Sequence, residues 1–386
     1  MTTKNTFNVM LVAGEASGDT HAANMFTELK KRLPNVVGMG MGGSNMAAAG
    51  IDLRFNSSEI GVIGMVEVLR HYPDIKRALT LMQKVACEEK PDLLICVDYK
   101  EFNYKLAKKA KACGIKVLFY VSPQVWAWRP GRVKKYGKII DMMAVIFPFE
   151  VPYYEAESVP VRYVGHPSVD KVHPRYSKGD AMRRFGLDSR KNVVGIFPGS
   201  RVNEIKRLLP VMLAAAKMLQ LEFPEVRFVL SQAPSVNDEL LGGYLQSEKL
   251  PIRVVKSEVY DVIQCCDAIM TSSGTATLEM ALMGVPMVVS YRLAWLTYIL
   301  GRLLVKTPYI CLVNIIAGKK IVEEYIQYEA TPNAMKEEIA RILTNEGYAA
   351  RMCFELADVK NKLGSGGGSE NMARLAAEML KGNNMA

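Results

Sequence analysis

The chain has 386 residues, which is enough for two domains of ordinary size. Hydrophobic residues make up 49% of it and the mean hydropathy is +0.06, values that exclude an intrinsically disordered protein. The 49 lysine and arginine residues outnumber the 39 aspartate and glutamate residues, leaving a net charge of +10. We therefore expect an anionic partner, such as nucleic acid, phospholipid headgroups or a phosphorylated substrate.

The seven cysteines show no Cys-x-x-Cys spacing, and most lie within apolar segments. We predict that they are reduced core residues of a cytoplasmic protein. The first five residues lead directly into a predicted strand and lack the basic and apolar regions of a signal peptide.

Two stretches have the composition of membrane-surface helices. No segment reaches the ~18 uninterrupted apolar residues that a membrane-spanning helix needs. Residues 60–82 and 291–305, however, mix aliphatic and aromatic side chains with lysine and arginine. This pattern is typical of an interfacial helix. The same pattern also occurs in amphipathic core helices, which are the more common case. Contact with an anionic membrane surface is thus a hypothesis.

The first half of the chain alternates apolar strands with helices. Strands are predicted at residues 7–13, 36–41, 93–97, 116–121, 142–147 and 161–164, with helices at 20–32 and from about residue 102. A strand, a glycine loop and a helix begin a Rossmann-like unit. Its loop, Gly-Glu-Ala-Ser-Gly-Asp at residues 14–19, lacks Gly-x-Gly-x-x-Gly spacing, which favours an acceptor or phosphate loop over a dinucleotide site.

Asp98 directly follows the apolar strand predicted at residues 93–97. Side chains at the carboxyl ends of parallel strands face the ligand crevice of an open α/β sheet. We therefore predict that Asp98 is a general base, the alternative being a cap for the next helix. Beyond the following strand, Trp126, Trp128 and Arg129 could form the wall of a site for an apolar or sugar ring, or simply a packed loop.

The second half repeats this design after a polar linker at residues 165–180. Strands are predicted at residues 192–197, 226–231, 252–255, 267–270 and 286–290, with a helix at 203–221 and a further strand and loop at 307–314. Residues from 330 onward are predicted to be helical. A Gly-Ser-Gly-Gly-Gly turn at 364–368 allows the last helix, 371–381, to fold back on the body.

The stretch Thr-Ser-Ser-Gly-Thr at residues 271–275 precedes a compact helix over 276–282. Unpaired backbone N–H groups and the positive end of the helix dipole suit a phosphate there, although the hydroxyls could merely cap the helix. Glu279, one turn further, could accept the hydroxyls of a ribose. Ser200 and Arg201, at the start of the helix over 203–221, form a second anion-binding element whose guanidinium could contact a diphosphate.

Several motifs are missing from the sequence. It contains no Asp-x-Asp, no His-Glu-x-x-His and no P-loop. We therefore expect neither a metal nor another cofactor, so that Arg201 and helix N-termini would neutralise a diphosphate. This combination fits glycosyl transfer from a nucleoside-diphosphate sugar.

Five motifs, in order over essentially the whole chain, resemble those of the lipid-A-disaccharide synthase family. They are Val-Ala-Gly-Glu-Ala-Ser-Gly-Asp at 12–19, Tyr-Val-Ser-Pro-Gln-Val-Trp-Ala-Trp at 120–128, Pro-Gly-Ser-Arg at 198–201, Ser-Gly-Thr-Ala-Thr-Leu-Glu at 273–279, and the segment 305–314. The tryptophan motif is highly specific to this family.

The resemblance implies an α/β protein of GT-B type, with two Rossmann-like domains facing across a cleft. The expected parts are an acceptor domain at 1–166, a UDP-sugar domain at 167–345 and C-terminal helices at 346–386 packing back on the body. The implied reaction is metal-free and inverting. It joins UDP-2,3-diacylglucosamine to 2,3-diacylglucosamine 1-phosphate through a β-1,6 linkage, and it yields lipid A disaccharide 1-phosphate and UDP.

Site residues carry over from the resemblance by position. Those implied for the acceptor, with Asp98 as the catalytic group, are Glu15, Ser17 and Asn103; those implied for UDP are Arg201, Ser273, Gly274, Thr275, Glu279 and Asn314. The chain departs from the family at one place, because Tyr-Lys-Glu follows Asp98 where the family usually has a proline and a second aspartate. The role of Glu101 is left open by this departure.

The resemblance also implies a Gram-negative cytoplasmic enzyme held peripherally at the inner face of the inner membrane, and it is compatible with a homodimer. One alternative is another GT-B enzyme acting on a UDP-N-acetylglucosamine-type substrate, either an epimerase or a different lipid glycosyltransferase. A nucleic-acid-binding protein is the other, but the basic residues are spread along helices rather than gathered in a stripe, so no nucleic-acid partner is expected.

Overall fold

The computed structural model describes residues 6–60, 72–128, 130–246, 250–295, 298–299 and 307–382. It divides into two compact units, one comprising Met1–Val169 with Ser365–Ala386 and the other Asp170–Gly364. The division thus lies three residues beyond the predicted boundary at 166. Residues 346–364, predicted to belong to a separate C-terminal segment, are part of the second unit, and only the last helix belongs to the first.

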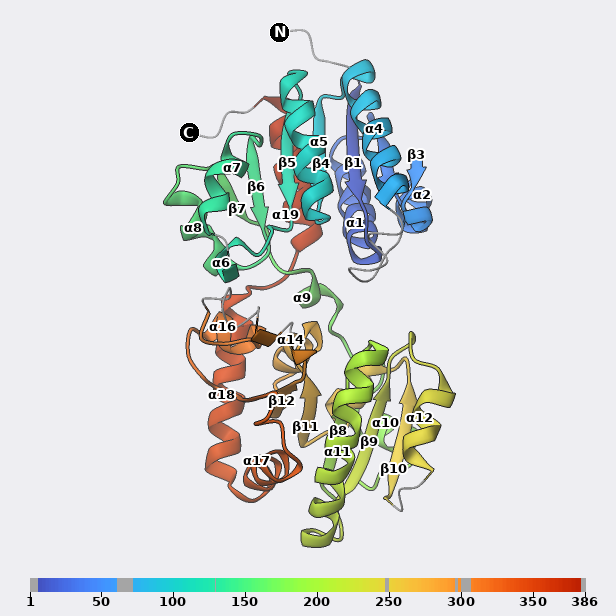
Figure 1. Ribbon diagram of the computed structural model, residues 1–386, viewed down its shortest axis with the longest axis vertical. Coiled ribbons are helices and arrows are strands. Elements are labelled where there is room, and N and C mark those ends of the chain that lie inside the picture. The colour runs from blue at the N-terminus through green and yellow to red at the C-terminus, as the bar shows by residue number, and fades with distance from the viewer. Residues whose placement is uncertain are drawn as a thin grey trace. The chain divides into compact units, whose positions relative to one another are not determined.

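The first unit is built on a parallel sheet (Figure 1). In the described residues its strand order is β3-β2-β1-β4-β5-β6-β7, the order of a doubly wound fold. These strands are β1 (Phe7–Ala13), β2 (Val36–Gly42), β3 (Ile51–Asn56), β4 (Leu93–Val97), β5 (Lys116–Tyr120), β6 (Met142–Val145) and β7 (Val161–Tyr163).

Helices cover both faces of this sheet, with α4 and α5 in front of it in Figure 1 and the packed pair α1 and α19 behind. All five residues of β4 are consequently buried, as its unbroken apolar run predicts. The helices are α1 (Ala16–Arg32), α2 (Ser44–Ala48), α4 (Tyr72–Glu89), α5 (Lys100–Ala112), α6 (Val125–Trp128), α7 (Val133–Gly137), α8 (Val151–Glu155), α9 (Pro167–Lys171, at the boundary) and α19 (Gly368–Lys381).

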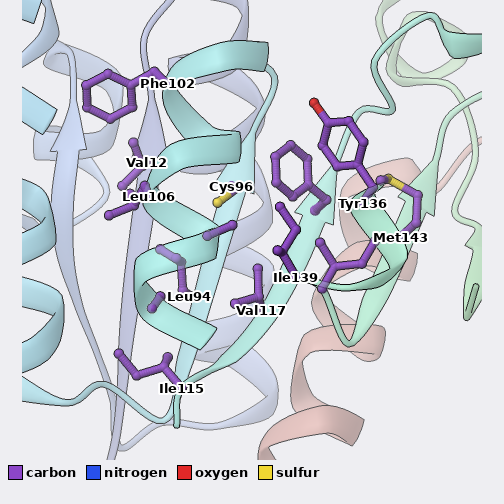
Figure 2. Close-up of a cluster of buried hydrophobic side chains, with 14 of the residues drawn as sticks. Val12, Leu94, Cys96, Phe102, Leu106, Ile115, Val117, Tyr136, Ile139 and Met143 are labelled. Atoms are coloured by element: carbon purple, nitrogen blue, oxygen red, sulfur yellow. The ribbon is translucent and has the colours of Figure 1, made fainter. Parts of the chain in front are cut away.

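One hydrophobic core of the first unit lies between the sheet and the helices on its α5 face. Figure 2 shows Phe102 and Leu106 of α5 beside Val12 of β1, and Tyr136 of α7 near Met143 of β6, with Cys96 of β4 between these two groups. Tyr136 is fully buried and makes edge contacts with the rings of Phe119 and Tyr104. This packing covers the face of the sheet on which α5 lies.

The second unit repeats the architecture on a parallel sheet of order β10-β9-β8-β11-β12-β13 within the described ranges. Its strands are β8 (Val193–Phe197), β9 (Arg227–Gln232), β10 (Ile252–Lys256), β11 (Ala268–Ser272), β12 (Met287–Tyr291) and β13 (Glu323–Ile326). Its helices are α10 (Lys178–Phe185), α11 (Val202–Glu222), α12 (Asp238–Leu245), α13 (Val259–Cys265), α14 (Thr275–Leu282), α16 (Leu312–Ala317), α17 (Pro332–Thr344) and α18 (Glu346–Lys362).

The predicted strand at residues 307–314 is wrong. The described residues form a loop that leads into helix α16, and the strand in this region is β13, about ten residues later. β13 has the sequence Glu-Glu-Tyr-Ile and lies at the sheet edge with half-buried residues. It therefore lacks the apolar run by which the other strands were recognised.

The prediction that all cysteines are reduced is also wrong. Cys87 of α4 and Cys113, just after α5, form a disulfide with their Cα atoms 5.7 Å apart. Packing of α4 against α5 brings together two residues that are 26 positions apart, which the sequence spacing did not indicate. The other five cysteines carry free thiols, and four of these are buried.

Among the described residues, none of the helices has the length and apolarity needed to cross a bilayer. Half of the two stretches predicted to be interfacial lies outside the described residues, at 61–71, 296–297 and 300–305. The described part of the first stretch, from Tyr72 on, opens α4. There Ala78 and Met82 are buried, while Tyr72 is 54% exposed.

Candidate active site

The second unit has a pocket of about 390 Å³ at the carboxyl ends of β8, β9, β10 and β11. The loops that follow these strands form its walls, including Gly199, Gln232, Ser257 and Ser273. Ligands of open α/β sheets bind at this edge. The pocket brings together four of the six residues predicted to bind UDP, which are Arg201, Ser273, Gly274 and Thr275.

The N-terminus of α14 opens into this pocket. Gly274 is its N-cap residue, and none of the described side chains caps the helix, so Ser273 does not have the capping role that was the alternative prediction. A methyl group built on Gly274 would contact no described atom within 4 Å. The start of α14 therefore borders open space, which suits an anionic ligand.

Glu279 lies one turn into α14 and is half-buried. Burial raises its pKa, against the lowering effects of a hydrogen bond from Tyr260 and the charge of Lys171. The Tyr260 hydroxyl donates to Glu279 Oε1 over 3.2 Å. Tyr260 thus orients the carboxylate and leaves its second oxygen available to accept hydroxyl groups.

Arg201 lines the pocket, but its guanidinium is engaged with another side chain. Arg201 Nη1 lies 3.1 Å from Glu204 Oε1, and the other carboxylate oxygen accepts the backbone N–H groups of Ser200 and Arg201. Glu204 thus already occupies the N-terminus of α11, which the sequence indicated as a second phosphate site. Gly199 makes room for it, since a Cβ there would lie 2.4 Å from Glu204 Oε2.

Asn314, the sixth predicted UDP ligand, is fully buried and uses its whole side-chain hydrogen-bonding capacity inside the protein. Its amide donates to the Val322 carbonyl and to Glu324 Oε1, and its oxygen accepts from the N–H groups of Ile321 and Val322. Glu324 in turn accepts the N–H groups of Ile310 and Cys311. Asn314 therefore ties α16 to the segment that follows it and orients Glu324, which holds the loop before α16. Any contribution of its side chain to UDP binding would be indirect.

In the first unit, Asp98 follows β4 at the carboxyl ends of the central strands β1, β4 and β5, which end level with one another. Ala13 pairs with Val97, and Val97 pairs with Tyr120. Burial raises the pKa of Asp98, while the charge of Lys100 and a backbone hydrogen bond lower it. The N-cap residue of α5 is Tyr99, and no side-chain hydrogen bond caps the start of this helix. Asp98 therefore does not serve as the helix cap considered above.

The backbone around Asp98 is held in a left-handed conformation. Asp98 and Tyr99 both have φ of +48°, and Val121 after β5 has φ of +68°, which is unusual for a β-branched residue. The amide of fully buried Asn103 donates to the Asp98 carbonyl over 2.8 Å. Such backbone conformations cluster at functional sites, where surrounding contacts maintain them. Asn103, predicted to bind the acceptor, is placed by the structure as a positioning residue for Asp98.

The loop after β1 supplies the other two predicted acceptor ligands. Glu15 and Ser17 are exposed at the same edge as Asp98, at the start of α1. The helix begins at Ala16 rather than near residue 20 as predicted. Asp19, inside this segment, is buried and caps α2 by accepting the N–H groups of Gly43 and Met46.

Two other residues near this end of the sheet, Trp126 and Glu101, contact side chains of the protein itself. Trp126 is buried and donates from Nε1 to Glu150 Oε1 over 3.2 Å, which supports the packed-loop interpretation for this residue. The side chains of Trp128 and Arg129 lie outside the described residues. Glu101 is exposed and forms an ion pair with Arg132.

Several pocket and edge residues were not predicted from the sequence. Gln232 and Ser257 each stand at the end of a predicted strand, so the reasoning applied to Asp98 could have found them. Glu204 is three residues after Arg201, a capping-box spacing. Glu150 gave no such signal, because it lies in a short helical turn and its burial depends on the tertiary packing. No group of three potential metal ligands occurs among the described residues.

Two Rossmann-like units, each with its candidate residues at the carboxyl ends of the strands, form the architecture of the GT-B fold. Solved structures share this fold. A UDP-N-acetylglucosamine 2-epimerase from Neisseria meningitidis bound to UDP-GlcNAc is similar over 98% of this chain and 100% of its own, with a TM-score of 0.64 and 14% identity. The calicheamicin glycosyltransferase CalG4 is similar over 97% of both chains, with a TM-score of 0.59 and 13% identity.

Sequence comparison identifies the family within this class. The lipid-A-disaccharide synthetase family model matches residues 9–376. The lipid-A-disaccharide synthase of Geobacter metallireducens is 48% identical over 372 residues, covering 96% of this chain and 97% of the relative. That of Nitrosococcus oceani is 46% identical over 377 residues, covering 98% and 97%. The chain belongs to the lipid-A-disaccharide synthase family and is a glycosyltransferase, as the resemblance predicted.

Proposed function

We propose that this glycosyltransferase joins UDP-2,3-diacylglucosamine to 2,3-diacylglucosamine 1-phosphate through a β-1,6 linkage. The products are lipid A disaccharide 1-phosphate and UDP. The observation that carries the proposal is the 48% identity to a lipid-A-disaccharide synthase over 96% of the chain. The alternative of an epimerase is not favoured, because the epimerases share only the fold at about the 14% identity level.

The second unit would hold the UDP part of the donor. Its diphosphate would accept hydrogen bonds from the amides at the start of α14, near Ser273, Gly274 and Thr275, with Arg201 as the cation. The ribose hydroxyls would donate to Glu279, whose orientation by Tyr260 supports this role. Fixed donors of this kind stabilise the charge that develops on the leaving diphosphate.

The first unit would activate the acceptor. Asp98 would take the proton of the acceptor hydroxyl as its oxygen attacks the anomeric carbon, while the bond from that carbon to the diphosphate breaks and UDP leaves. Displacement from the opposite side inverts the anomeric centre. A pKa raised by burial suits a carboxylate to this task. Glu15 and Ser17 would contact the acceptor sugar, and Asn103 would hold the Asp98 backbone.

We further propose that the enzyme works at the inner face of a Gram-negative inner membrane and that it forms a homodimer. Acylated substrates and a net charge of +10 support peripheral binding to anionic lipid. Co-sedimentation with vesicles of neutral and anionic lipid at two salt concentrations tests the membrane part, and light scattering tests the dimer. Equal binding to neutral vesicles and to anionic vesicles would contradict the role given to charge.

A radioassay tests the reaction itself. Incubation with UDP-2,3-diacylglucosamine and 2,3-diacylglucosamine 1-phosphate should give one disaccharide and stoichiometric UDP, with undiminished turnover in excess chelator. UDP-N-acetylglucosamine alone should remain unchanged. Absence of disaccharide would overturn the proposed reaction, and turnover abolished by the chelator would overturn its metal-free form.

A further inference from the structure

Glu204 is the carboxylate of the pocket in the second unit, and it already makes the contacts expected of a bound anion. One oxygen lies 3.1 Å from Arg201 Nη1, and the other accepts the N–H groups of Ser200 over 3.2 Å and Arg201 over 3.3 Å. A phosphate at the N-terminus of α11 would use the same guanidinium and the same amides.

The surroundings of Glu204 hold it in this place. Its side chain is 14% exposed, whereas the Arg201 side chain is 68% exposed, so the carboxylate is the fixed partner of the pair. The loop is shaped around it, because Gly199 has φ of +112° and a Cβ there would lie 2.4 Å from Glu204 Oε2. The carboxylate and the start of α14 line one and the same pocket.

We propose that Glu204 is a resident counter-anion of the UDP site: it competes with the diphosphate for the Arg201 guanidinium and for the backbone N–H groups of Ser200 and Arg201, and so lowers UDP affinity. The inference rests on the proposed binding of UDP in this pocket. It directs the diphosphate to the α14 amides and leaves Arg201 shared between ligand and carboxylate. An enzyme that must release UDP in each turnover benefits from such a competitor, because product release limits many enzymes.

The alternative is that Glu204 acts only as a helix cap. Its spacing from Arg201 is that of a capping box, and a cap stabilises α11 whether or not a ligand is present. The two roles have different consequences when the charge is removed but an acceptor oxygen is kept. If Glu204 is only a cap, the variant loses stability and its UDP affinity does not increase. If Glu204 is a competitor, the variant releases Arg201 and its UDP affinity increases.

The experiment is calorimetric titration of wild type, Glu204→Gln and Glu204→Asp with UDP and with uridine. Glu204→Gln should bind UDP roughly tenfold more tightly than wild type, since one like charge near the diphosphate is removed. Its affinity for uridine, which has no phosphate, should be unchanged. Glu204→Asp disturbs the cap but keeps the charge, so its UDP affinity should not exceed that of wild type. Glu346→Gln, at the start of α18, controls for net charge and should bind both ligands as wild type does.

Each outcome is decisive. Equal or weaker UDP binding by Glu204→Gln, or an equal gain for uridine, overturns the competitor role while the UDP site stands. Unfolding of both Glu204 variants at the assay temperature, read by thermal denaturation, shows that the carboxylate is a cap and also overturns it. Failure of wild type to bind UDP instead refutes the proposed function on which the inference depends.

Discussion

Gly274 and Gly199 line the same pocket, but a methyl group would meet different surroundings at the two positions. At Gly274 the backbone is extended, with φ of 169°, and no described atom lies within 4 Å of a built Cβ. At Gly199 φ is +112° and the Cβ would lie 2.4 Å from Glu204 Oε2. We therefore predict that the same substitution mainly weakens UDP binding at Gly274 and mainly lowers stability at Gly199.

Gly274→Ala replaces glycine by alanine at an N-cap, which reduces stability by about 0.5–1 kcal/mol. Its methyl group would stand where the diphosphate approaches the α14 amides. Loss of one charge-assisted hydrogen bond, about 1.5–3 kcal/mol, weakens UDP binding by roughly 10–100-fold. Gly199→Ala should instead lose about 1–3 kcal/mol from backbone conformation alone, before any displacement of Glu204 is counted.

Thermal denaturation and calorimetric titration with UDP measure the two effects on the same samples. Each kcal/mol corresponds to about 2–4 °C in a unit of this size, so the two variants should be separable by Tm. Wild-type UDP affinity in Gly274→Ala would refute the placement of the diphosphate at α14. Wild-type Tm in Gly199→Ala would refute the strain inferred from its conformation.

Three further predictions concern titratable groups. Asp98→Asn should lower kcat by ~10² or more with UDP affinity unchanged in calorimetry, and unchanged turnover would remove Asp98 from this role. Because the base must be deprotonated, wild-type kcat/KM should fall as pH drops through the raised pKa of Asp98. Glu279→Ala should weaken UDP binding by about tenfold, whereas Tyr260→Phe, which removes only the orienting hydroxyl, should weaken it less; equal affinities would contradict the ribose contact. Burial raises the pKa of Glu150 to about 7, so the folded protein binds more protons than the unfolded chain between the ordinary carboxyl pKa and 7, and wild type should lose stability as pH rises through this range. Glu150→Gln cannot titrate, so the difference between its Tm and that of wild type should rise by several degrees in its favour between pH 5 and pH 8. A pH-independent difference would contradict the raised pKa of this carboxyl.

Much of the fold could be predicted because parallel strands covered on both faces have a continuous apolar sequence. β1 and β4 begin and end where the apolar runs at residues 7–13 and 93–97 predict. β13 could not be found in this way, since its glutamates are tolerated at a sheet edge. The Cys87–Cys113 disulfide depends on how α4 packs on α5, which no local pattern reports.

The candidate site was predictable where chemistry follows position on a sheet. Asp98 and the start of α14 lie at strand ends, and the structure places both at the expected edges of their units. What each side chain contacts was not predictable. Asn103 and Asn314 match the family motif, yet both are fully buried and hold backbone in place. Likewise, the pairing of Arg201 with Glu204 appears only when the loop conformation is known.

The return of α19 to the first unit affects how the protein is made. Its buried face, which includes Met372, Leu375 and Ala376, packs on α1, but it is synthesised after the whole second unit. Between Asp170 and Gly364 a ribosome spends on the order of 10–40 s, during which the apolar face of α1 awaits its partner. The nascent first unit is thus a candidate client for chaperones until α19 has been synthesised.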